Sequence, residues 1–79
     1  MRTVEGDEIL FTTVALARDW KDNGKTFTKD QLEHFVTACG DVMYRWGLHG
    51  HKMQTDAREI CRKLIMVLIL RANERLQTL

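Results

Sequence analysis

The stretch Leu64–Leu70, LIMVLIL, places seven consecutive apolar residues in a chain of only 79 residues. A run of this kind fits either a buried strand or a helix. Strong helix formers flank it on both sides without a breaker, and no second strand-like run is present to pair with it. The sequence therefore predicts a helix. The run is much shorter than the roughly 20 residues that a membrane-spanning helix requires, so we do not expect a membrane anchor.

This predicted helix covers about residues 54–77, and start and stop signals place two more helices before it. Thr28 and Gln31 have the spacing of a capping box, which predicts a second helix over about 29–46. Its apolar residues follow the helical 3 and 4 spacing: Leu32, Phe35, Val36, Cys39, Val42, Met43 and Trp46. Gly40 in its middle suggests a close helix crossing, and Gly47 is expected to end it.

The first helix is predicted over about residues 7–22. Asp7 and Glu8 place negative charge where a helix N-terminus favours it. Asn23-Gly24 is a pair suited to a left-handed residue at the end of this helix. The chain is therefore expected to be all-α, a single three-helix domain.

Residues of the second and third helices pair well if the two helices form an antiparallel hairpin about Gly50. That arrangement puts Cys39 level with Cys61, Val36 with Leu64, and Leu32 with Leu68. On a helical wheel centred on Leu64, one face of the third helix then meets the second helix. We expect that face to consist of Ala57, Ile60, Cys61, Leu64, Val67 and Leu68.

Met66 and Leu70 do not fit this face, because they fall on the side of the third helix that should meet water. Ile69 borders them, and Phe11 is similarly off the main apolar face of the first helix. An apolar patch rimmed by charge is typical of a contact surface. We expect a two-fold homodimer that uses Met66, Ile69, Leu70 and Phe11. The alternative is that the first helix wraps further round and buries these side chains.

The turn between the second and third helices carries a second group of aromatic, Met and His side chains, a composition usual at interfaces. These residues are a possible partner surface: Tyr44, Trp46, Leu48, His49, His51 and Met53. The alternative is structural, with Trp46 and Leu48 closing the open end of the hairpin.

Charge gives little support to a dedicated nucleic-acid binder. Twelve Lys+Arg against eleven Asp+Glu leave a formal net charge of +1, far from a strong positive field. Basic residues do gather toward the start of the third helix, and they are the alternative nucleic-acid contacts: Lys52, Arg58, Arg62 and Lys63. Asp56 and Glu59 interrupt them, and Glu59 with Lys63 has the spacing of a favourable ion pair.

The two cysteines and two of the histidines suggest a zinc site, but their spacing argues against it. In the hairpin, His49 and His51 lie at the turn, while Cys39 and Cys61 lie about three turns away, roughly 15 Å. A Cys39–Cys61 disulfide is geometrically conceivable. The N-terminus MRTVEGDEIL lacks a basic-then-apolar start, so we expect a reducing cytoplasm and two free thiols.

Enzyme signatures such as a glycine-rich phosphate loop, a nucleophile elbow or an H-E-x-x-H helix are not found in the sequence. We therefore expect no catalytic residues, no metal and no cofactor. The expected function is that of a small cytoplasmic accessory or regulatory protein that binds another protein as a homodimer. The alternative is a small DNA-binding transcriptional regulator that uses the basic half of the third helix.

Overall fold

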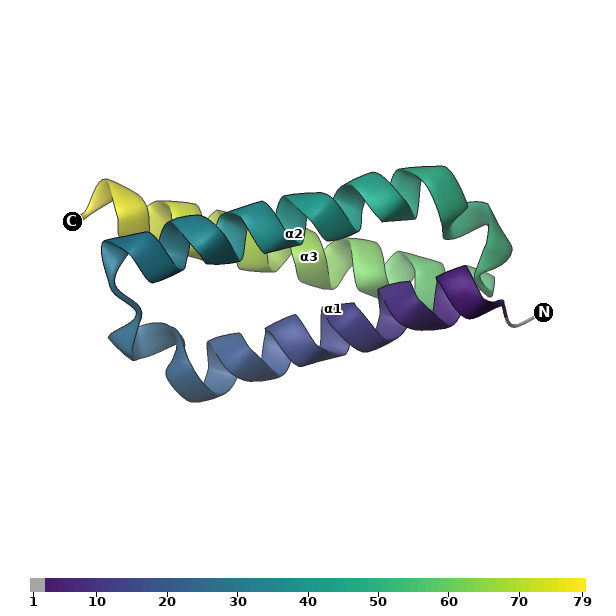
Figure 1. Cartoon of the computed structure of the whole chain (residues 1–79), viewed down its shortest axis with the longest axis horizontal. Helices are drawn as coiled ribbons and strands as arrows, with labels where there is room; N and C mark the ends of the chain where they lie inside the picture. The colour runs from purple at the N-terminus through teal and green to yellow at the C-terminus, as the bar shows by residue number, and fades with distance from the viewer. Residues whose placement is uncertain (1–2) are drawn as a thin grey trace.

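Three long helices make up nearly all of the computed structural model, which describes residues 3–79. They are α1 (Val4–Asn23), α2 (Lys29–His49) and α3 (Thr55–Gln77). Single 3-10 turns connect them, η1 (Gly24–Thr26) and η2 (Gly50–Lys52). The helices lie side by side along a body of 42 × 20 × 17 Å, and successive helices run in opposite directions (Figure 1). Residues 3–79 contain no strand, so the predicted all-α class is confirmed.

Capping side chains explain where the first two helices begin. The Thr28 hydroxyl accepts a hydrogen bond from the backbone amide of Gln31 at 3.2 Å, and the Gln31 side-chain oxygen Oε1 accepts one from the backbone amide of Thr28 at 2.8 Å. This is the predicted capping box. α1 begins three residues before the predicted position because Thr3, whose hydroxyl accepts from the Gly6 amide at 3.0 Å, is its N-cap.

α1 ends at Asn23, close to the predicted end, but two predictions about glycines at helix ends are wrong. Gly24 has a right-handed φ of −55° instead of a left-handed one. Gly47 lies inside α2, which continues to His49, so the turn is Gly50–Lys52. Gly24 and Gly50 each lie against a tryptophan four residues earlier. A Cβ would lie 2.9 Å from the Trp20 ring at Gly24 and 3.4 Å from the Trp46 ring at Gly50. These glycines allow the rings to pack closely.

The buried positions recur every 26 residues along the chain. Positions 26 residues apart therefore occupy equivalent places in one core. Thr13 is fully buried in α1 because it has the place that Cys39 has in α2 and Ile65 has in α3. Its hydroxyl donates to the Ile9 carbonyl at 2.7 Å, which satisfies the buried donor within α1. The buried equivalents are Ile9, Phe35 and Cys61, followed by Thr13, Cys39 and Ile65.

Side-chain hydrogen bonds to the backbone close each end of the bundle. At one end, Trp46 Nε1 donates to the Arg58 carbonyl at 3.0 Å and joins α2 to α3. At the other end, the Arg75 guanidinium donates to the carbonyls of Gly24, Lys25 and Phe27. Arg75 thus ties the end of α3 to the connection between α1 and α2, a role that its position near a helix C-terminus did not reveal.

Replacing Arg75 with alanine should lower the free energy of unfolding by about 1–3 kcal/mol, because three carbonyls lose a charged donor. Urea unfolding measures the change. Arg18→Ala is the control, since Arg18 is exposed on α1 and lies outside the connection that Arg75 contacts, and its effect should stay within about 0.5 kcal/mol. Equal effects of the two substitutions would contradict the role given to Arg75.

Replacing Gly40 with alanine and replacing Gly24 with alanine should change the stability of the protein in opposite directions. A Cβ at Gly40 meets nothing within 4 Å, so the close helix crossing expected there is wrong. Gly40→Ala should stabilise the protein by up to about 1 kcal/mol through helix propensity. Gly24→Ala should destabilise it, because the Cβ would meet the Trp20 ring. Thermal unfolding of the two variants tests this, and two shifts of the same sign would refute it.

Candidate interaction surface

α3 has apolar side chains on both of its faces. One face is buried in the core through Cys61, Ile65, Leu68 and Ala72. The rest of the helix surface, which we call the α3 outer face, exposes between 37% (Leu64) and 58% (Leu70) of each large apolar residue. Those residues are Ile60, Leu64, Met66, Val67 and Leu70.

The outer face is larger than predicted, because the orientation expected for α3 is wrong. Ile60, Leu64 and Val67 were expected to face α2, but they are exposed. The centre of the buried strip lies about 70° round the helix from Leu64. The prediction aligned α3 with α2 alone. In the structure α3 packs against both α1 and α2. The buried side of α3 is therefore the side that points between these two helices.

Residues singled out for the interface differ in their surroundings. Met66 is 52% exposed and Leu70 58%, so α1 does not cover them. Phe11 on α1 is 78% exposed. Ile69 is only partly exposed, because it packs against the core. Ile69 is therefore a border residue.

Charged side chains share the outer face with the apolar ones. Lys63, Arg71 and Glu74 are all exposed there. Arg62, at the edge of the face, pairs with Glu59 at 3.0 Å and donates to the sulfur of Met66 at 3.7 Å. The predicted partner of Glu59 was Lys63. The pairing with Arg62 leaves Lys63 among the apolar residues of the outer face.

The apolar surface continues from α3 onto α1. Leu10 on α1 and Ala57 on α3 line one hollow, so those sides of the two helices face each other. Val14 lies one turn after Leu10, and Leu64 lies two turns after Ala57, on the same sides. Val14 is exposed, and together with Phe11 it lines a second, shallower hollow on α1.

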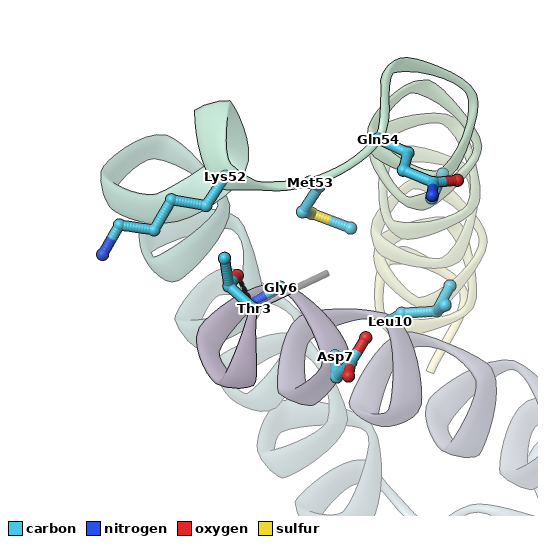
Figure 2. Close-up of a pocket in the computed structure, with 8 residues that line it drawn as sticks. Thr3, Gly6, Asp7, Leu10, Lys52, Met53 and Gln54 are labelled. Carbon is cyan, nitrogen blue, oxygen red and sulfur yellow. Dashed lines mark hydrogen bonds between the residues drawn. The ribbon is translucent and has the colours of Figure 1, made fainter. Parts of the chain in front are cut away.

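The hollow shared by Leu10 and Ala57 has a volume of about 340 Å³ (Figure 2). Met53 extends into it from the connection that leads to α3, while Asp7 and Leu10 rise from α1 below (Figure 2). A Cβ at Gly6 would lie 3.1 Å from the Met53 side chain. Glycine at this position therefore lets the first turn of α1 approach the connection closely.

The predicted turn cluster is divided between core and surface. Trp46 and Met53 pack against the core, which agrees with the structural alternative for Trp46. Leu48 is 53% exposed, so it does not close the end of the helix pair. Tyr44 and His51 are exposed as well. His49 is half-buried beside α1, and its Nδ1 has no hydrogen-bond partner among the described residues.

Three of the four basic residues considered for nucleic acid are paired with a carboxylate or half-buried. Lys52 lies 3.6 Å from a carboxylate oxygen of Glu5. A backbone hydrogen bond, and then the charge of Lys52, lower the pKa of Glu5. Arg62 pairs with Glu59, and the Arg58 side chain is half-buried near Gly50. Lys63 is the exposed member of this group.

Both cysteines are buried in the core with free thiols. Across residues 3–79, no group of three or more His, Cys, Asp or Glu side chains is placed to hold a metal ion. None of the described helices is long and apolar enough to cross a membrane.

Comparison with known proteins found no matching family model, no matching curated protein and no matching solved structure.

Burial raises the pKa of the Cys39 thiol to about 11 and also raises the pKa of Cys61. In the unfolded chain a thiol titrates near 8.5, so above that pH the unfolded state loses protons first. Stability should therefore fall as pH rises from about 8.5 to 11, by up to about 1.4 kcal/mol per pH unit for Cys39. Urea unfolding across this range, compared with Cys39→Ala, isolates the effect. Parallel pH profiles for the two proteins would contradict it.

Proposed function

We propose that this protein acts without catalysis, as a small cytoplasmic accessory or regulatory protein that binds other polypeptide through the α3 outer face. In the simplest form of the proposal the bound polypeptide is a second copy. The α2–α3 hairpin of each copy then presents its α3 to the other copy. The observation that carries the proposal is the concentration of exposed apolar residues on one helix.

Scattered apolar residues are normal on protein surfaces, but contiguous ones mark contact sites. Five large apolar side chains are exposed on α3, over about three turns of the helix between Ile60 and Leu70. Val14 extends this surface onto α1, and Lys63, Arg71 and Glu74 lie among or beside the apolar residues. An apolar centre with a charged rim is the composition of a protein interface.

The size of the core supports self-association. Among residues 3–79, nine apolar residues are buried, and a core of this size stabilises a short chain by only a few kcal/mol. Packing against a second copy would remove further apolar surface from water. Each Å² buried in this way would stabilise the folded state by about 25 cal/mol. The same residues would then serve both folding and binding.

DNA binding ranks below protein binding because of the ion pairs near the start of α3. Lys52 and Arg62 are each within 4 Å of a carboxylate. Their attraction for phosphate is reduced accordingly. A band shift with nonspecific DNA at low salt should therefore be absent. A salt-sensitive shift would favour the alternative function, a DNA-binding transcriptional regulator.

The double substitution Met66→Glu/Leu70→Lys should convert a dimer into a monomer, because it replaces two apolar contacts of the interface with charged side chains. Sedimentation equilibrium at micromolar concentration should give twice the 9.2 kDa chain mass for the native protein and one chain mass for the variant. A native protein that is folded and monomeric would contradict the proposal.

The matched control is Tyr44→Glu/Leu48→Lys on α2. These residues have the same four-residue spacing and similar exposure, 61% and 53%. This variant should remain a dimer. Circular dichroism should show that both variants keep the helix content of the native protein, so that loss of folding is not mistaken for loss of binding.

A further inference from the structure

We propose that the second copy lies antiparallel, with two α3 helices packed about a two-fold axis. Val67 of each copy contacts Leu70 of the other, and Lys63 of each copy pairs with Glu74 of the other. This arrangement rests on the proposed function, since it specifies the partner and register of the same surface.

A single stripe of side chains runs along the outer face at alternating spacings of three and four residues. This is the spacing of a coiled-coil seam. All six residues are exposed, and they lie opposite the buried strip of α3: Ile60, Lys63, Val67, Leu70, Glu74 and Gln77. The stripe therefore offers a second helix a continuous seam that the chain's own core does not use.

Charge selects the orientation of the second helix. In a parallel pair each seam residue meets its own copy, so Lys63 would face Lys63 and Glu74 would face Glu74. In an antiparallel pair the first position of each heptad meets the fourth position of the other chain. Lys63 then faces Glu74 at both ends of the contact, and like charges no longer meet.

The apolar residues select the register. With Lys63 opposite Glu74, Val67 falls opposite Leu70 twice about the axis, which forms an apolar centre. A shift of one heptad would instead place Val67 opposite Lys63 of the other copy and would bury an unpaired charge. One register therefore satisfies both the charges and the apolar contacts.

The flanks of the seam fit the same register. Leu64 lies beside the seam on one side, and the antiparallel pairing brings it near Arg71 of the second copy. The aliphatic part of an arginine covers apolar surface while its charged end stays in water. Met66 lies on the other flank, near Asn73 of the second copy. Both exposed side chains would then be partly covered.

Charge reversal tests the orientation. Lys63→Glu and Glu74→Lys should each weaken the dimer at least about fivefold at low salt, because each single variant places like charges together. The double variant Lys63→Glu/Glu74→Lys should restore native affinity. In a parallel dimer the single variants would exchange one like-charge pair for another, so affinities unchanged by the single variants would overturn the proposal.

A distance measurement provides an independent test. A spin label on Gln77→Cys should lie at least about 25 Å from the label on the other copy, because Gln77 lies opposite Ile60 in the antiparallel pair. A parallel pair would bring the labels within about 15 Å, and that result would overturn the orientation. A dimer with close labels refutes only this arrangement, whereas a folded monomer refutes the proposed function as well.

Discussion

The constraint on which the structure depends is that a helix in a three-helix bundle buries only one side. Seven consecutive apolar residues span nearly two turns of α3 and therefore point in every direction around it. The packing of α3 against α1 and α2 covers the strip from Cys61 to Ala72. The apolar residues on the other side remain outside the core of the chain. The fold thus leaves an apolar surface in a fixed place, between Ile60 and Leu70 of α3.

Local signals predicted the helices well, because short-range contacts decide them. The Thr28–Gln31 capping box fixed the start of α2, and both of its hydrogen bonds are present. The prediction for Gly24 failed because glycine can supply either a left-handed turn or room for a neighbour, whereas neither reason applies at Gly40 and Gly47, where a Cβ would meet nothing within 4 Å. At Gly24 and Gly50 the neighbour is a tryptophan, and close packing decides the geometry.

The orientation of α3 could not be predicted from pairing with α2 alone. A continuous apolar run has no polar residue to mark its outer side, so its rotation depends on both neighbouring helices. As a result, Met66 and Leu70 were recognised as exposed, while Ile60, Leu64 and Val67 were missed. The 26-residue recurrence of Trp20 and Gly24 in Trp46 and Gly50 was a usable signal. Aligning on it places Cys61 and Ile65 where α2 has its buried Phe35 and Cys39.

If the proposed function holds, a second polypeptide covers the α3 outer face of the native protein in solution. Methyl signals of the native protein, measured with a soluble paramagnetic probe, test this most directly. Leu70 and Val67 should be protected from the probe nearly as well as the buried Leu32, while Leu48 on α2 should broaden strongly. Broadening of Leu70 and Val67 equal to that of Leu48 would show that the outer face meets water and would contradict the account.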